Sequence, residues 1–304
     1  MIEVQHLSKK FVDNWALQDT SWKLGTRRSM GLLGPNGAGK STTMKIITGL
    51  LCATDGQVLV DGEDIFHHPV ACKKKIGYLP ETPPLYDDLN VKSYLKFVCG
   101  LKSVPTYHHT SQMDLAIEKM NLQSVAYKPI SDLSKGFRQR VGIAQALIGD
   151  PPILILDEPS VGLDPQQVFE LRKVIIALKT EHTILLSTHV LTEVQEICDD
   201  VVILDRGQVK AQGALQEILS QMQPGHSIRI QVQKITKALL TDLNEISGVI
   251  SIQQDGQWLE VRCGQNFDRL DIFVEPILKN DSGLLAIEKH HARLEDVFIE
   301  VTKE

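Results

Sequence analysis

The chain has 304 residues, of which 42% are hydrophobic and 23% charged, and its net charge is −6. This composition indicates a globular protein of about two domains, and the negative charge argues against direct nucleic-acid binding through broad phosphate neutralisation. The five cysteines lie far apart without a C-x-x-C pair, so neither a disulfide framework nor a zinc site is predicted. No stretch has enough consecutive apolar residues to cross a bilayer, so any work at a membrane requires a partner.

Residues 1–220 predict an α/β domain with a largely parallel sheet, because short apolar runs alternate with helical patterns. These runs are almost continuously apolar, as is typical of strands that helices cover on both faces. The clearest of them are residues 29–33, 153–157, 183–187 and 200–204. Residues 91–148 are mostly helical in pattern, and we expect them to form a helical insertion in this domain.

The sequence "GPNGAGKS", residues 34–41, follows the first of these strands and opens a helical pattern, which is the context of a phosphate-binding P-loop. Glycines let backbone N–H groups turn toward phosphate oxygens, and the helix N-terminus adds partial positive charge. We expect Lys40 to reach the outer phosphates and Ser41 to bind Mg²⁺. The predicted nucleotide-binding residues of this loop are Gly34, Pro35, Asn36, Gly37, Ala38, Gly39, Lys40, Ser41 and Thr42.

Two carboxylates, Asp157 and Glu158, stand at the end of the apolar strand "ILILD". An unpaired charge there is unfavourable unless it faces a cation or water. We expect Asp157 to hold Mg²⁺, directly or through water, and Glu158 to orient or deprotonate the attacking water. The alternative is a helix-capping acidic turn. That alternative suits Asp164 better, because Asp followed by Pro165 is a common helix start, although both roles can coexist at Asp164.

Two further segments are candidates for phosphate contacts. His189 follows the strand at 183–187, and the carboxyl ends of parallel strands are where an α/β sheet collects ligand groups, so a γ-phosphate contact is favoured over a structural role. In "LSKGFRQR", Ser134 can cap a helix and Gly136 lets backbone approach a ligand. Taken alone, this second segment fits a capped amphipathic helix better than a phosphate contact.

The pattern changes after residue 220, and residues 225–304 predict a small α+β domain. Its order is β-α-β-β-α-β, followed by a last helix within residues 294–304. Asp255-Gly256 between the middle strands is a hairpin signal. The expected strands are residues 227–233, 248–254, 258–263 and 284–290, and the expected helices start at Thr236 and Phe267.

In order and spacing, "GPNGAGKST", "LSKGFRQR", "ILILDEPSVGLD" and His189 resemble the motifs of ATP-binding cassette (ABC) ATPases over about residues 1–220. The resemblance implies a P-loop NTPase fold, ATP and Mg²⁺ as ligands, and ATP hydrolysis with Glu158 and His189 as catalytic residues. The order of motifs disfavours a P-loop kinase or GTPase, and no N-K-x-D motif is present.

The resemblance also implies a composite site in an ATP-dependent homodimer. Ser134, Lys135 and Gly136 would close over the nucleotide that the P-loop of a second subunit holds, with Asp164 at the dimer interface. Phe11 matches the aromatic residue that stacks on adenine, and a core aromatic is the alternative for it.

Two positions depart from the commonest family pattern. Glu81 in "IGYLPETPPLY" replaces a Gln that contacts Mg²⁺ and water and helps to couple to the transport domain; a carboxylate can still bind Mg²⁺. Lys135 and Phe137 replace the first Gly and the Gln of "LSGGQ". With the tail "LEDVFIEVT", these features are similar to ABC-2 type exporter ATPases, including the gliding-motility type.

The implied function is to power a separate integral membrane permease from the cytoplasmic face of the cell membrane. The alternative is a soluble ABC ATPase acting on ribosomes or nucleic acid. Proteins of that kind tend to carry two cassettes or long heptad arms, and the sequence has neither. The transported cargo does not follow from this chain, because specificity would lie in the permease.

Overall fold

The computed structural model divides the chain into two compact units, Met1–Leu215 and Gln216–Lys303. It describes residues 1–221, 226–264, 269–290 and 294–302. None of the helices in these ranges is both long and apolar enough to span a bilayer.

The first unit is built on a six-stranded sheet with the order β10-β9-β3-β8-β7-β6. Neighbouring strands from β9 to β6 pair in parallel, and β10 is antiparallel to β9. The predicted α/β fold with a largely parallel sheet is therefore confirmed, and every residue of β3, β7 and β8 is buried, as their apolar sequences indicated. The strands are β3 (Ser29–Leu33), β6 (Ile76–Leu79), β7 (Ile153–Asp157), β8 (Thr183–Ser187), β9 (Asp200–Asp205) and β10 (Gln208–Ala214).

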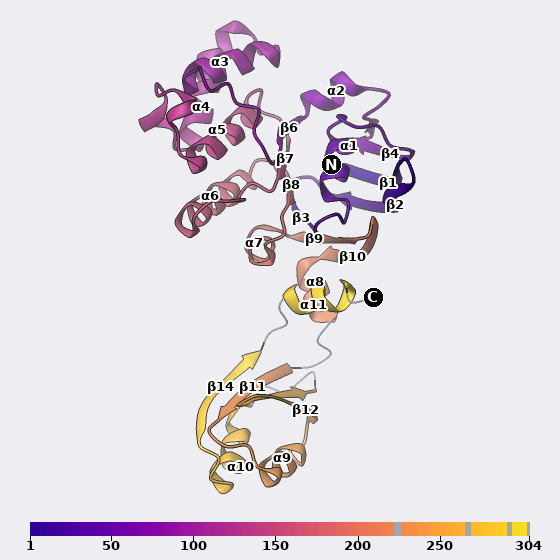
Figure 1. Ribbon diagram of the computed structural model, residues 1–304, viewed down its shortest axis with the longest axis vertical. Helices are drawn as coiled ribbons and strands as arrows, with labels where there is room; N and C mark the ends of the chain where they lie inside the picture. The colour runs from indigo at the N-terminus through magenta and orange to yellow at the C-terminus, as the bar shows by residue number, and fades with distance from the viewer. Residues whose placement is uncertain (222–225, 265–268, 291–293, 303–304) are drawn as a thin grey trace. The chain divides into compact units, whose positions relative to one another are not determined.

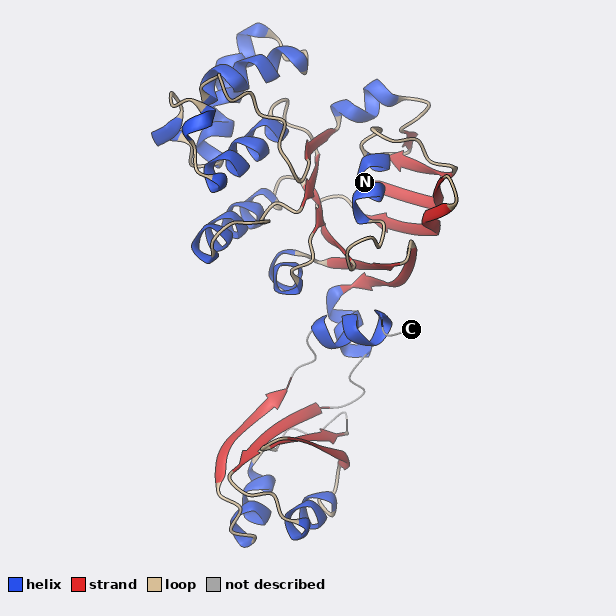
Figure 2. Cartoon of the chain, viewed as in Figure 1, coloured by secondary structure: helices blue, strands red, loops and turns tan. Residues whose placement is uncertain are grey.

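A second, antiparallel sheet with the order β2-β1-β4-β5 was not among the predicted elements. One hydrophobic core joins it to the parallel sheet through α1 (Lys40–Ile47): Val4, Met44 and Ile155 represent the three layers in the same buried cluster. Figures 1 and 2 show α1 between the two sheets. The strands are β1 (Ile2–Phe11), β2 (Asn14–Leu24), β4 (Asp55–Val60) and β5 (Glu63–Asp64).

The remaining helices of the first unit flank these sheets. In Figure 1, α6 (Pro165–Leu178) and α7 (Leu191–Ile197) lie on the face of the parallel sheet opposite α1. The expected helical segment at 91–148 contains three helices joined by short 3₁₀ turns. Its helices are α3 (Val91–Leu101), α4 (His109–Lys119) and α5 (Lys135–Leu147), and the short α2 (Pro69–Lys74) precedes them.

The second unit has the predicted β-α-β-β-α-β order in one antiparallel sheet, arranged β12-β13-β11-β14. Its own core contains Ile230 and Leu259 from the sheet, with Leu239 and Phe273 from the helical segments. The predicted hairpin joins β12 to β13, with Gly256 at φ 61. The elements are α8 (Leu215–Gln221), β11 (His226–Val232), α9 (Lys237–Asn244), β12 (Val249–Asp255), β13 (Trp258–Cys263), α10 (Val274–Lys279), β14 (Leu284–His290) and α11 (Leu294–Thr302).

The second helix of this unit differs from its prediction. The expected start, Phe267, lies outside the described residues, and the described helical structure begins with a 3₁₀ turn at Asp271–Phe273 that leads into α10.

Candidate active site

The loop between β3 and α1 has a backbone shape that requires glycine. Gly37 and Gly39 have φ of 83 and 106, in the left-handed region that side chains disfavour. A Cβ on Gly39 would lie 2.6 Å from the carbonyl oxygen of Ala16, and one on Gly34 would lie 2.4 Å from that of Leu204. The loop is therefore pressed between neighbouring backbone segments. Gly39 supplies no side-chain cap to α1, which leaves the N–H groups of the first turn without a side-chain acceptor.

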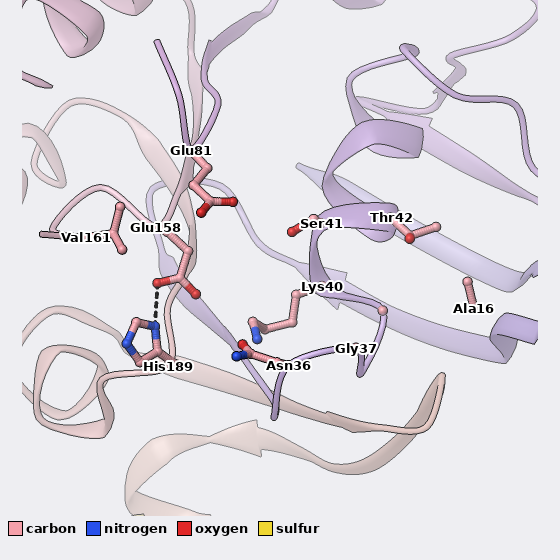
Figure 3. A pocket seen from close by; sticks show the side chains of 11 residues that line it. Ala16, Asn36, Gly37, Lys40, Ser41, Thr42, Glu81, Glu158, Val161 and His189 are labelled. Atoms are coloured by element: carbon pink, nitrogen blue, oxygen red, sulfur yellow. Dashed lines mark hydrogen bonds and ion pairs between the residues drawn. The ribbon is translucent and has the colours of Figure 1, made fainter.

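A cavity of about 360 Å³ opens beside this loop. Glu81 follows β6, Glu158 follows β7 and His189 follows β8, so three adjacent parallel strands deliver polar side chains to one edge of the sheet. Figure 3 shows the carboxylates of Glu81 and Glu158 on one side of the cavity, with Lys40 and Ser41 on the other. The lining residues are Ala16, Asn36, Gly37, Gly39, Lys40, Ser41, Thr42, Glu81, Glu158, Val161 and His189.

Lys40 is buried at the base of this site. Its Nζ donates hydrogen bonds to the carbonyl oxygens of Gly34, at 2.7 Å, and Pro35, at 3.2 Å. Burial lowers the pKa of Lys40, and the charges of Glu158 and other nearby carboxylates oppose this shift. An ammonium group has three N–H donors, so Lys40 keeps one for a phosphate oxygen while it ties down the loop.

Asp157 precedes Glu158 at the end of β7 and is buried, with 3% of its surface exposed; it is not among the lining residues. Within the described residues, its Oδ1 has no hydrogen-bond partner. Burial raises the pKa of Asp157, and the charges of Glu158 and Glu81 raise it further, while the side chain of Ser187 and the charge of Lys40 lower it. A buried carboxylate oxygen without a donor fits a site for a cation or for a water bound to one.

The donor set fits Mg²⁺ that is held jointly with a nucleotide. No group of three His, Cys, Asp or Glu side chains within the described ranges is arranged to hold a metal ion unaided. Mg²⁺ commonly takes only one or two protein carboxylates and completes its octahedral shell with water and substrate phosphates. Ser41, Asp157 and Glu81 meet that description, because Ser41 and Glu81 line the cavity and Asp157 adjoins Glu158.

Glu158 has a strained backbone, with φ 47, which is uncommon for a residue with a side chain. Its N–H donates to the carbonyl oxygen of Ser187 at 2.9 Å, so the turn is tied to β8. Its Oε2 lies 2.7 Å from Nδ1 of His189 (Figure 3). Because a carboxylate only accepts hydrogen bonds, Nδ1 carries the proton in this pair. The side chain of Glu158 is 11% exposed and that of His189 is 55% exposed, so the imidazole borders solvent.

The loop at 134–136 does not line this cavity. Ser134 is the N-cap of α5, and its Oγ accepts a hydrogen bond from the N–H of Phe137 at 3.4 Å. Ser134 and Lys135 are exposed and Gly136 is buried; a Cβ there would lie 2.6 Å from Oε1 of Gln167. Within one chain, the structure thus keeps the two predicted phosphate contacts apart.

Six other predicted residues also lie outside the cavity lining: Phe11, Gly34, Pro35, Ala38, Asp157 and Asp164. Phe11 ends β1, is 45% exposed and has Nζ of Lys9 at 5.2 Å from its ring centre. Asp164 is the N-cap of α6, where its Oδ1 accepts from the N–H of Gln167 at 2.9 Å and Pro165 follows, so the helix-capping role is confirmed.

Ala16 and Val161 line the cavity but were not predicted. Neither carries a reactive group that a motif search would notice. Ala16 belongs to β2 of the unpredicted sheet, so no sequence pattern indicated it. Val161 stands three residues after Glu158, and its proximity to that carboxylate was an available signal.

Comparisons with known proteins indicate the family of this chain. A family model described as ABC transporter matches residues 17–161. The uncharacterized ABC transporter ATP-binding protein YxlF of Bacillus subtilis (strain 168) is 30% identical over 304 residues, 99% of each chain. The lantibiotic transport ATP-binding protein SrtF of Streptococcus pyogenes is 36% identical over 210 residues, 69% of this chain and 89% of the relative.

A solved structure shares the fold. The dimeric structure of MJ0796, a bacterial ABC transporter cassette, matches with a TM-score of 0.65 over 71% of this chain and 99% of its own, at 23% identity. Together with the P-loop, the paired carboxylates and the histidine at one sheet edge, these matches place the protein in a family: the chain belongs to the ATP-binding, ATP-hydrolysing subunits of ABC transporters.

Proposed function

We propose that this ABC ATPase closes as a homodimer around two Mg²⁺-ATP molecules and thereby drives a separate membrane permease of the ABC-2 exporter type. The observation that carries the proposal is the division of polar groups in one chain. Lys40, Glu158 and His189 share one cavity, whereas Ser134 and Gly136 lie elsewhere. A second copy would supply the missing contacts by placing its Ser134 loop over the γ-phosphate.

The residues around the cavity suit in-line attack of water on the γ-phosphate. Lys40 and the loop N–H groups would bind the phosphate oxygens, and Glu158 would orient the water and accept its proton. His189, which already donates to Glu158, would border the γ-phosphate and hold the carboxylate in place. Mg²⁺, held by Ser41, Asp157 and Glu81, would neutralise charge that develops on the phosphate oxygens.

The dimer contacts would come from α5 and α6. Ser134 would present its hydroxyl and the first N–H groups of α5 to the partner's nucleotide, with exposed Lys135 adding a positive charge. Asp164, at the start of α6, would lie at the interface. Phe11, exposed at the end of β1, would stack on adenine. The dimeric form of the MJ0796 cassette supports this arrangement.

The helical segment is the proposed contact with the permease. It exposes large apolar side chains, including Leu101 at its surface, beside a cavity of about 640 Å³ that Val70, Lys73 and Lys74 also line. An amphipathic, acidic segment of a membrane protein fits such a surface. The protein would then work at the cytoplasmic face of the membrane. SrtF is described as a lantibiotic transport ATP-binding protein, which supports a role in transport rather than on ribosomes or nucleic acid.

The second unit is proposed to be an accessory domain. Among the residues that the structure describes, those that line the catalytic cavity run from Ala16 to His189 and belong to the first unit. Its separate core is consistent with a part that is attached to the ATPase and is not needed to form the site.

The proposal is tested with Glu158→Gln, which keeps the shape of the side chain and removes its basicity. We expect ATP affinity to stay within about twofold of wild type, and hydrolysis to fall by roughly a hundredfold or more. ATP should then convert the variant from monomer to dimer in size-exclusion chromatography with light scattering.

The matched control is Glu118→Gln, at an exposed position on α4, which should hydrolyse ATP like the wild type. Unchanged hydrolysis in Glu158→Gln would remove Glu158 as the base. A variant that binds ATP and stays monomeric, even with its membrane partner present, would overturn the composite site.

A further inference from the structure

The backbone on either side of His189 is held by hydrogen bonds that do not involve the imidazole ring. His189 lies between β8 and α7, and its ring is mostly exposed, so the hydrogen bond to Glu158 is the side chain's described anchor. Val190, the N-cap residue of α7, provides no side-chain cap. A loop of this kind would leave the imidazole loosely placed unless the residues on either side of it are fixed.

Two buried side chains fix them. Thr188 is 0% exposed and Glu193, on α7, is 3% exposed. The hydroxyl of Thr188 donates to Oε2 of Glu193 at 2.9 Å, and the N–H of Val190 donates to the same hydroxyl oxygen at 3.0 Å. The residues that precede and follow His189 are thus both tied to α7 through one carboxylate.

The direction of these hydrogen bonds is determined by the groups present. A backbone N–H only donates and a carboxylate only accepts, so the single proton of the Thr188 hydroxyl must point to Glu193. Gln at position 193 would keep a carbonyl oxygen that can accept this proton, whereas Leu has no acceptor. With Leu there, the hydroxyl proton would lose its buried acceptor, which is unfavourable. The loop therefore needs an acceptor, and burial of a carboxylate calls for such a partner.

We propose that Glu193 is a positioning residue for ATP hydrolysis, which acts through Thr188 to hold His189 against Glu158. This inference rests on the proposed roles of Glu158 and His189. The carboxylate of Glu193 does not line the cavity and touches no reacting atom. Its contribution is to keep the loop in the one arrangement in which the imidazole meets the catalytic carboxylate, because small displacements of catalytic groups slow a reaction strongly.

The test compares steady-state ATP hydrolysis by Glu193→Leu, Thr188→Val and the double variant in the full chain. We expect each single variant to lower kcat roughly tenfold with KM changed less than about twofold, because ground-state ATP contacts remain. The double variant should be no slower than either single variant, since both break the same connection. Thr188→Ser keeps the hydroxyl and should retain most of the wild-type kcat.

Glu196→Leu is the matched control, because Glu196 is an exposed carboxylate on the same helix and pairs with Arg172. It should leave kcat unchanged. A Glu193→Leu protein with wild-type kcat would overturn the inference, as would one whose only defects are a lower melting temperature and weaker ATP binding. If Glu158→Gln itself still hydrolyses ATP, the proposed function fails first; if it does not and Glu193→Leu does, only the positioning role fails.

Discussion

Lys102 shows how one buried charge can serve a helix end. Its Nζ donates to three carbonyl oxygens near the C-terminus of α5: Gln145 at 2.9 Å, Ala146 at 2.9 Å and Ile148 at 2.7 Å. The last carbonyls of a helix have no partners within it and carry partial negative charge, so a cation is favourable there. Burial nevertheless lowers the pKa of Lys102 to about 8.

This pKa predicts a pH dependence of stability that Lys102→Met should abolish. Below about pH 8, Lys102 is protonated in the folded and the unfolded chain, so the cost of burying the charge is constant. Between about 8 and the ordinary value of 10.5, the unfolded chain binds the proton and the folded chain releases it. The free energy of unfolding of wild type should therefore rise relative to Lys102→Met across this window, by about 1 to 3 kcal/mol.

Urea unfolding of both proteins at about pH 8, 9 and 10 measures this difference, and the comparison at each pH cancels the titration of all other groups. A difference that stays constant with pH would contradict the pKa shift of Lys102.

Site residues differ in how far the sequence predicts them. Lys40 and Ser41 follow from a local loop motif, and Glu158 and His189 follow from the rule that parallel strands end at one edge. Each is found where that reasoning places it, around one cavity. Ala16 could not be predicted, because it reaches the cavity through a sheet that was not predicted.

At the scale of elements, the N-cap residues of α5 and α6 allow a structural role and a functional role to be measured separately. Asp164 accepts from the N–H of Gln167 at 2.9 Å, whereas Ser134 accepts from that of Phe137 at 3.4 Å, a weaker hydrogen bond. We expect Asp164→Ala to lower the free energy of unfolding by about 1 kcal/mol, and Ser134→Ala to lower it by less than about 0.5 kcal/mol.

The loss of ATPase activity should follow the opposite order, with Ser134→Ala more affected than Asp164→Ala. Ser134→Ala should lose most ATPase activity if its hydroxyl contacts the partner's γ-phosphate, while its urea unfolding curve stays near that of wild type. Equal losses of activity and stability at Ser134 would indicate that it is a helix cap and nothing more.

The two sheets of the first unit differ in predictability for a physical reason. Strands β3, β7 and β8 have the bounds that the sequence predicts, because strands buried on both faces are marked by continuous apolar runs. Strands β1 and β2 pair with several register shifts and expose one face, so their apolar pattern is interrupted. The pairing of β1 with β4 joins segments far apart in the chain, which local patterns do not report.

At the scale of the whole molecule, the separate hydrophobic cores predict two unfolding transitions. One core lies around α1 between the two sheets of the first unit, and the other lies in the second unit between its sheet and helices. Differential scanning calorimetry of the full chain should resolve two peaks, and ATP with Mg²⁺ should raise only the melting temperature of the first unit, since binding stabilises the part that binds.

Leu259→Ala, in the core of the second unit, should move only the other peak downward, because it removes a fully buried side chain. A single peak that responds to both changes would show that the two units unfold together.

The boundary at Leu215 and Gln216 has a consequence for how such proteins can change. The described residues that line the cavity all precede this boundary, and the sheet after it has a hydrophobic core of its own. A sensor domain or a membrane anchor could replace that sheet without changing the residues of the ATPase site. The alignment with SrtF spans 69% of this chain and that with YxlF spans 99%. These two relatives are therefore suitable sources of sequence for the first chimeric proteins.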